Sequence, residues 1–467
     1  MNSYERAREF AKKYVDPVAT KIDEEGRFPK EIFDKLGEEG FFKLMIPTKT
    51  LVKIASLYKD IKRSEEFGIE VEGYKLNEEI IYERKKKVVK SLQDGIDFLF
   101  KGYPNLTYIQ GFASFKDNKT VVVKKNDGGE EELTFDKCIV GTGSKDMNPL
   151  PGKELPNVLS STDLLNLKEI PKSMIVIGTG VIGLEFASIY SIFGTEVTVI
   201  GNNVFKVSDG EVQKRLKSIL KSDTLKFEVK QRAQKIEQDG DLLKVTTKMT
   251  GKDKEKEYTA EYVLVALGRS CNTDGLNTEA AGLETEKGGL IVDENLMTNV
   301  ENIYAIGDVI YGNTQLAHLA SAQGIWLVEK FSDVKTKIRL DLVPSVLYTT
   351  PEVAMIGKTE EELTEEGVEF IKSKFLYQSN GKALSASETE GFVKIIATPD
   401  KKKILGCHIL GAEADFMIHF ANIAMTNDLS AQDLTDMIYA HPTVSEVFKD
   451  AVEMLENKSI NTPNPNK

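Results

Sequence analysis

Hydrophobic positions in the first hundred residues follow the spacing of amphipathic helices. Between Ala7 and Tyr14, apolar side chains recur every three or four residues, which puts them on one helical face. The spacing returns after Pro29, a residue suited to a helix start. The pattern predicts two helices within residues 4–44, a third at 50–67 and a long, charged fourth at 77–100.

After Pro104 the apolar period shortens to two, the period of β-strands. From Met174 a strand, a glycine turn, a helix and another strand follow in order, as in a nucleotide-binding βαβ domain. The tail after residue 341 mixes strands and helices, which predicts a mixed sheet. The expected elements are strands at 107–109, 111–116, 120–124, 132–140, 264–267 and 302–306, and helices from 316, at 416–426 and at 444–455.

Composition narrows the function classes. A chain of 467 residues with 41% hydrophobic content is expected to form several domains. A net charge of -12 argues against nucleic-acid binding, which relies on clustered Lys and Arg. No run of eighteen apolar residues and no secretory signal is present, so we expect a cytoplasmic protein without a membrane partner. The three cysteines lack metal-binding spacing, so no metal site is expected.

The strongest local signal is the glycine turn that follows the strand at 175–177. Gly178 permits a tight backbone, Gly180 permits close approach of a pyrophosphate, and Gly183 lets the helix pack on the strand. The phosphates would then meet the N-terminus of the helix. With a strand before the turn and a helix and strand after it, the pattern predicts dinucleotide binding.

One part of this pattern is missing. The second strand should end in an acidic residue for the adenosine ribose, but the chain has Gly201, Asn202 and Asn203 there. No Arg replaces the acid, so a 2′-phosphate pocket is not indicated. The sequence leaves the choice between NAD and NADP open.

Four segments together resemble dihydrolipoamide dehydrogenase, a pyridine nucleotide-disulfide oxidoreductase, and the resemblance runs from about Ile46 to Glu456. The segments are residues 178–200, 266–269, 304–309 and 440–446. The resemblance implies an α/β fold with doubly wound FAD- and NAD(P)-binding domains and an α+β dimerisation domain. It also implies a homodimer and suggests a 2-oxo acid dehydrogenase complex as a partner. The implied domains are FAD-binding at 48–150 and 282–340, NAD-binding at 151–281 and dimerisation at 341–460.

The resemblance also implies roles for individual residues. Lys49 and Glu185 would form an ion pair near the reactive flavin nitrogen, and Asp308 would bond the ribityl chain. His441, oriented by Glu446, would be the acid-base that serves the dithiol. The implied cofactor-binding residues are Gly178, Gly180, Gly183, Gly268, Arg269, Thr142, Gly143, Gly307 and Asp308.

The residues alone support His441 more weakly. It precedes a predicted helix, and a carboxylate five positions on could fix its tautomer. The other histidines, at 318, 408 and 419, lie among apolar residues and are expected to be packed in cores.

The front of the chain departs from the family. Ile46-Pro47-Thr48-Lys49 survives, but the two redox cysteine positions before it hold Gly40 and Met45, neither of which can form a thiolate or a disulfide. No strand and glycine turn precede them. Residues 7–47 instead resemble the N-terminal segment of acyl-CoA dehydrogenases, so the chain looks like a chimera of a helical segment, 1–47, and an oxidoreductase body that lacks its first βαβ unit.

These observations give three functional hypotheses. The first is a flavin- and NAD-linked oxidoreductase that has lost dithiol oxidation, with weakened FAD binding and residual NADH-dye reductase activity. The second is a non-catalytic NAD-binding dimer or scaffold subunit. The third is a protein that assists an acyl-CoA dehydrogenase through its front helices.

Overall fold

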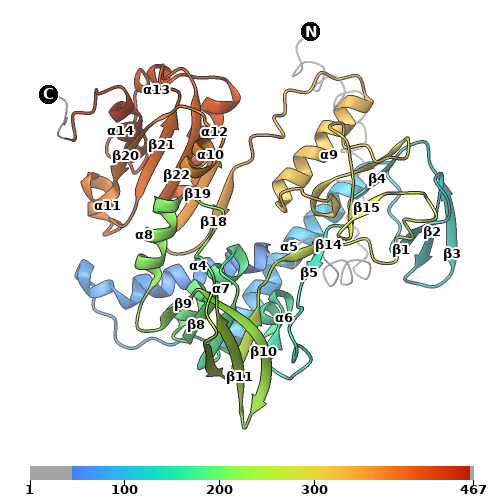
Figure 1. The fold of residues 1–467 in the computed structure, drawn as a ribbon, viewed down its shortest axis with the longest axis horizontal. Helices are drawn as coiled ribbons and strands as arrows, with labels where there is room; N and C mark the ends of the chain where they lie inside the picture. The colour runs from blue at the N-terminus through green and yellow to red at the C-terminus, as the bar shows by residue number, and fades with distance from the viewer. Residues whose placement is uncertain (1–44, 463–467) are drawn as a thin grey trace, which may run out of the picture.

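The structure, a computed structural model, describes residues 45–462 of the chain. The helices expected within residues 4–44, and all but the last three residues of the helical segment 1–47, lie outside the described residues. Figure 1 shows three groups of elements: a sheet-and-helix unit around α7 and β8, a C-terminal unit around β21 and β22, and a unit that contains β4 and α9.

Two long helices open the described chain. α4 (Met45–Lys62) begins five residues before its expected start, because Pro47 is tolerated in a first turn, whose N–H groups have no helical acceptor. The 3₁₀ helix η2 (Ser64–Phe67) follows it. α5 (Glu78–Lys101) is capped by the Asn77 side chain, which accepts a hydrogen bond from the Ile80 amide. α4 packs against α5 and α7, and this anchors the front of the described chain to the nucleotide-type sheet.

An antiparallel meander follows, and it corrects two of the expected strands. It consists of β1 (Gly111–Phe115), β2 (Thr120–Lys125) and β3 (Glu130–Thr134). The strand expected at 107–109 is wrong, because pairing begins only where Gly111 faces Lys125. The strand expected at 132–140 is two strands in different sheets, since β4 (Cys138–Val140) leaves the meander to pair with β17.

The nucleotide-type unit is a five-stranded parallel sheet in the order β6-β13-β7-β8-β9. Its central strand is a continuous apolar run, as expected for a strand covered on both faces, and Ile175 and Ile177 are each 1% exposed. An antiparallel three-stranded sheet extends from it. The elements are β6 (Val158–Leu159), α6 (Ser161–Asn166), β7 (Ser173–Ile177), α7 (Val181–Phe193), β8 (Glu196–Gly201), α8 (Gly210–Leu220), β9 (Leu225–Val229), β13 (Tyr262–Val265), and the added β10 (Gln231–Asp239), β11 (Leu242–Met249) and β12 (Glu255–Ala260).

The third unit has much less sheet. β4 and β17 (Ile303–Ala305) form a two-stranded parallel pair that no other described strand joins. The Ile139 side chain, at the centre of β4, is 38% exposed. The remaining elements are β5 (Ser144–Asp146), β14 (Arg269–Cys271), β15 (Thr285–Glu286), β16 (Gly289–Leu290), η3 (Gly307–Val309) and α9 (Ala317–Phe331).

The C-terminal unit is a five-stranded sheet in the order β18-β19-β22-β21-β20, with α12 and α14 packed against it. The tail was expected to form a mixed sheet, but every pair is antiparallel. The elements are β18 (Ser345–Leu347), β19 (Glu352–Gly357), α10 (Glu360–Glu365), β20 (Ile371–Leu376), η4 (Tyr377–Ser379), α11 (Gly381–Ser385), β21 (Phe392–Ala397), β22 (Ile404–Gly411), α12 (Ala414–Thr426), α13 (Ala431–Thr435) and α14 (Glu446–Leu455).

A buried lysine fastens this unit to the nucleotide-type unit. Lys394 of β21 is 1% exposed, and its Nζ lies 2.9 Å from both carboxylate oxygens of Asp209 at the start of α8. It also pairs with Glu211 and Glu360. Burial alone would lower the Lys394 pKa, but these carboxylates hold the pKa above its ordinary value. The charged contact fixes the two units relative to each other.

Candidate active site

The glycine turn between β7 and α7 has the shape that a dinucleotide pyrophosphate requires. Gly178 has a φ of +124°, and a Cβ there would lie 2.1 Å from the Ala266 carbonyl oxygen. A Cβ on Gly183 would lie 2.3 Å from the Gly178 carbonyl oxygen, so the helix packs on the turn only without a side chain. A Cβ on Gly180 would meet nothing within 4 Å. Gly180 is the N-cap of α7 and caps it with no side chain, which leaves the first helical amides available to an anion.

This turn opens into a large cavity where the three units meet. The cavity has a volume of about 3370 Å³. The predicted site residues that line it come from α4, α7 and several loops and strand ends, and they are Lys49, Glu185, Gly178, Gly180, Gly268, Arg269, Thr142, Gly143, Gly307 and Asp308. Gly183 packs beneath the turn, and His441 and Glu446 lie away from this cavity.

An ion pair joins the first described helix to the nucleotide-type unit. Lys49 Nζ lies 2.7 Å and 2.9 Å from the two carboxylate oxygens of Glu185, which is 5% exposed. Glu185 also accepts a hydrogen bond of 3.0 Å from the Tyr348 amide. Lys49 Nζ sits 4.0 Å from the centre of the Tyr348 ring, within cation–π range. The lysine charge is thus held at the cavity wall from two sides.

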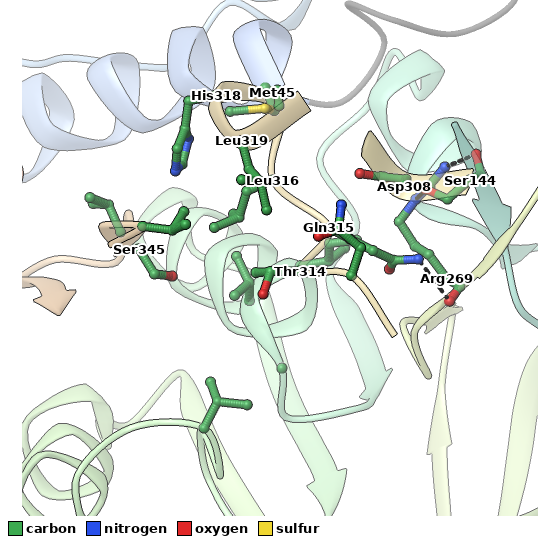
Figure 2. Close-up of a pocket in the computed structure, with 18 of the residues that line it drawn as sticks. Met45, Ser144, Arg269, Asp308, Thr314, Gln315, Leu316, His318, Leu319 and Ser345 are labelled. Carbon is green, nitrogen blue, oxygen red and sulfur yellow. Dashed lines mark hydrogen bonds between the residues drawn. The ribbon is translucent and has the colours of Figure 1, made fainter. Parts of the chain in front are cut away.

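A second polar network joins β5 and β14 to η3, the 3₁₀ helix that follows β17. Figure 2 shows Asp308, Ser144 and Arg269 close together at one side of the cavity. Ser144 Oγ donates to Asp308 over 2.7 Å, and Arg269 Nε donates to Ser144 Oγ over 2.8 Å. Arg269 also pairs with Asp146 at 2.6 Å. The network fixes the Asp308 carboxylate where the resemblance places the flavin ribityl chain, and that role stays a prediction.

In the C-terminal unit, outside the cavity lining, His441 pairs with the carboxylate of Glu446. Its Nδ1 lies 3.0 Å from one Glu446 oxygen and 3.1 Å from the other. Burial alone would raise the Glu446 pKa, but the Thr443 amide and His441 hold the pKa below its usual value. A carboxylate on Nδ1 leaves Nε2 as the acceptor. The imidazole is 79% exposed, so it faces outward from this subunit.

The other histidines correct an expectation. His408 is buried, with Nε2 3.0 Å from the Lys358 carbonyl oxygen, as a packed core residue should be. His318 and His419 are exposed and line the cavity, so the prediction that they are packed in cores is wrong. Some of their apolar neighbours, among them Leu319 and Phe416, line the same cavity.

The cysteines stand apart from this site. All three, Cys138, Cys271 and Cys407, are free thiols, and none lines the cavity. Met45 lines it instead, and Figure 2 labels it among the lining residues. The sequence did not indicate Tyr348, whose amide and ring both contact the ion pair, because nothing in its local pattern marks it.

Comparison with known proteins identifies the family. The family model described as "Pyridine nucleotide-disulphide oxidoreductase" matches residues 26–324 of this chain. The model of the dimerisation domain of the same family matches residues 343–452. This chain belongs to the pyridine nucleotide-disulphide oxidoreductase family. The members of this family are FAD- and NAD(P)-linked oxidoreductases. The match confirms the fold that was expected from the sequence.

Several relatives cover most of the chain. The mitochondrial dihydrolipoyl dehydrogenase of Pisum sativum is 37% identical over 421 residues, which span 89% of this chain and 83% of the relative. The dihydrolipoyl dehydrogenase of Bacillus subtilis is 35% identical over 441 residues, 91% of this chain and 92% of the relative. Among solved structures, the HOCl-induced flavoprotein disulfide reductase RclA of Escherichia coli matches with a TM-score of 0.77 and 27% identity, covering 88% of this chain and 89% of that one.

The comparisons also bear on one further expectation from the sequence. The family match begins at residue 26, inside the segment 7–47 that resembles acyl-CoA dehydrogenases, so that resemblance finds no support. Within residues 45–462, none of the helices combines the length and hydrophobicity that crossing a membrane requires. In the same residues no cluster of three or more acidic, histidine or cysteine side chains suits a metal ion.

The two cofactors of the family fit the described residues unequally. Gly180 leaves the open approach that a nicotinamide dinucleotide needs, above unsatisfied helix amides. For FAD, the described residues supply the Asp308 network but no second glycine turn at the end of a strand beside β4. Within residues 45–462, only β4 and β17 pair there. The described chain thus holds the glycine turn of the nucleotide site but only part of the flavin site.

Proposed function

We propose that this protein is an NAD(P)H-linked flavin oxidoreductase that no longer oxidises a dithiol. The observation that supports this most is the cavity lining. It gathers Lys49, Glu185 and the Gly178 turn but none of the three cysteines in the chain. Dithiol exchange needs a thiolate at the flavin face, and Met45 cannot supply one.

The chemical state of the three thiols points the same way. Burial raises the pKa of Cys138 to about 11 and raises that of Cys407 further. Burial also raises the pKa of Cys271. Each thiol is therefore protonated near neutral pH, whereas the attacking species is the thiolate.

The charged residues of the cavity would serve hydride transfer without a dithiol. Bound nicotinamide and flavin supply the redox chemistry themselves, and the protein orients them and sets the charge around them. Lys49, held by Glu185 and Tyr348, places a fixed positive charge at the wall of the cavity. A fixed positive charge stabilises negative charge that develops on an electron acceptor.

The matched dimerisation domain supports a homodimer as part of this proposal. Ile438, three residues before the exposed His441, is 100% exposed, and a second subunit would cover it. The proposed domains remain 48–150 with 282–340, 151–281 and 341–460. The resemblance to dihydrolipoamide dehydrogenase makes a 2-oxo acid dehydrogenase complex the partner to test.

The test combines a visible spectrum with two assays. Purified protein is expected to show little flavin absorbance, to reduce a dye from NADH or NADPH after FAD is added, and to form no NADH from dihydrolipoamide and NAD. Lys49→Met should lower dye reduction at least about tenfold, whereas His441→Gln should leave it unchanged because no dithiol requires the imidazole. Dihydrolipoamide oxidation that His441→Gln abolishes would overturn the proposal.

A second function is favoured by the incomplete sheet around β4. With Ile139 38% exposed and a single partner strand, this unit offers the flavin a smaller support than the nucleotide-type unit offers its own ligand. The protein would then be a non-catalytic NAD-binding dimer or scaffold subunit. Nucleotide binding without dye reduction after FAD addition would select this function over the first.

A further inference from the structure

The end of β8, where an adenosine ribose would lie, carries no acid. Gly201 ends the strand, and Asn202 and Asn203 follow. The Asn202 side-chain oxygen accepts a hydrogen bond of 2.6 Å from Thr250, and the Asn203 carbonyl accepts one of 2.6 Å from Thr179. The loop is therefore fixed against the glycine turn without a carboxylate for the 2′-hydroxyl, which is the usual mark of NAD selection.

Two cations line the cavity beside this loop. Lys206 and Arg232 are both exposed and both belong to the cavity wall. The Phe205 amide donates to the Thr179 carbonyl over 3.0 Å, which holds the residue before Lys206 at the glycine turn. The Lys230 amide donates to the Asn202 carbonyl over 3.1 Å, which brings the start of β10, and with it Arg232, to the same loop. Lys206 and Arg232 thus belong to two segments, far apart in sequence, that backbone hydrogen bonds hold at this loop.

Charge around the loop is unbalanced. Within residues 45–462, neither Lys206 nor Arg232 takes part in an ion pair. The acidic residues of the neighbouring elements are already engaged: Asp209 with Lys394, Glu211 with Lys374 and Lys394, and Glu228 with Lys256 and Tyr258. No acidic residue of the described segment 200–234 lines the cavity. This end of the cavity is therefore positive and has no internal anion.

We propose that Lys206 and Arg232 form a subsite for the 2′-phosphate of NADP, so that the protein binds NADPH more tightly than NADH. The inference rests on the proposed nucleotide binding at the glycine turn and specifies which nucleotide binds there. A 2′-phosphate is a dianion with several acceptor oxygens, and Arg can bind it with two parallel hydrogen bonds. Lys206 supplies a second, single charge.

Equilibrium titration tests the subsite independently of turnover. NADPH and NADH are titrated separately into the full-length protein, with nicotinamide fluorescence or calorimetry as the readout. Arg232→Ala and Lys206→Ala should each weaken NADPH binding about five- to tenfold and leave NADH binding within about twofold. Lys226→Ala is the matched control, because Lys226 lies on β9 opposite Thr198, outside the cavity wall, and should change neither affinity.

A third variant adds the missing acid instead of removing a cation, so its result does not depend on truncating a side chain. Asn202→Asp is nearly isosteric, retains the acceptor for Thr250 and adds the missing acid. It should weaken NADPH binding about tenfold and leave NADH binding equal or tighter. The NADPH preference of the wild type should also decline as salt rises, because exposed charges are screened.

The outcomes separate this inference from the proposed function. NADPH bound more tightly than NADH, with the preference removed by Arg232→Ala or Lys206→Ala, supports the subsite even if no dye is reduced. A wild type that binds NADH more tightly than NADPH overturns it. So do variants that weaken both nucleotides equally, or a protein that binds neither. Dye reduction that fails while this preference holds counts only against the proposed function.

Discussion

The two units that face each other across the cavity differ in how completely their central strands are covered. In the nucleotide-type unit, β7 lies inside five parallel strands, and Ile175 is 1% exposed. In the unit that contains β4, one partner strand is present, and Ile139 is 38% exposed. Both units belong to one family fold, yet only the first keeps its full strand set in the described chain. Among the described residues, the nucleotide-type unit is therefore the more completely formed of the two.

The largest expected effect breaks the intact unit. Gly183→Ala places a Cβ 2.3 Å from the Gly178 carbonyl oxygen, so we expect a loss of about 3 kcal/mol in unfolding free energy and no NADPH binding. Thermal unfolding and NADPH fluorescence measure the two effects. Gly180→Ala is the control, since its Cβ meets open space: it should keep the melting temperature and lose only affinity. If both variants unfold alike, the assignment of separate packing and ligand roles is wrong.

A smaller loss is expected at the ion pair that joins α4 to the intact unit. Lys49→Met leaves the buried Glu185 carboxylate with the Tyr348 amide alone. We expect a loss of about 2 kcal/mol in unfolding free energy, the cost of a buried polar group left partly unsatisfied. Lys53→Met, on an exposed face of the same helix, should change stability by less than about 0.5 kcal/mol. Equal effects in chemical denaturation would show that the pair adds nothing.

Removing one methyl group from the central strand of each unit compares directly how well the two strands are covered. Ile175→Val should cost about 1 kcal/mol, the usual value in a packed core, whereas Ile139→Val should cost less than about 0.5 kcal/mol because its side chain is partly exposed. Urea denaturation of the two variants measures the difference. An equal cost at both sites would mean that β4 is covered in solution.

The smallest effect concerns pH. Burial, together with the neighbouring Asp415, raises the pKa of Glu352 to about 8. The folded protein then keeps a proton that the unfolded chain releases near pH 4.5, so this stability is present in acid and is lost as the pH rises toward 8. Glu352→Gln removes this pH dependence of stability. As the pH rises from 5 to 8, the melting temperature of the variant relative to that of the wild type should increase by about 2 °C. If this difference in melting temperature shrinks between pH 5 and 8, the pKa of Glu352 is not raised.

Local pattern predicted much of the intact unit. Gly178, Gly180 and Gly183 follow a strand and precede a helix, and the structure shows the tight turn, the open approach and the close packing that their spacing implies. Strand pairing was harder to predict, because period alone does not tell which sheet a strand joins. The run at 132–140 has one continuous pattern but serves two sheets.

Features that depend on distant segments escaped the sequence. Arg232 lies on a different strand from Asn202, so the residues next to Asn202 in sequence give no sign of the cation that the proposed subsite uses. His318 and His419 have apolar neighbours in sequence, but each lies on the exposed face of its helix. The Lys49 and Glu185 pair came from the resemblance, since 136 residues separate the partners.

The most direct test of the difference between the nucleotide site and the flavin site combines one visible spectrum with one activity assay on the same sample. Purified protein is titrated with FAD under visible absorbance and then given dihydrolipoamide and NAD. The account predicts little bound flavin at purification and no lipoamide-dependent NADH formation at any FAD concentration. A stoichiometric flavin spectrum accompanied by rapid NADH formation from dihydrolipoamide would contradict it.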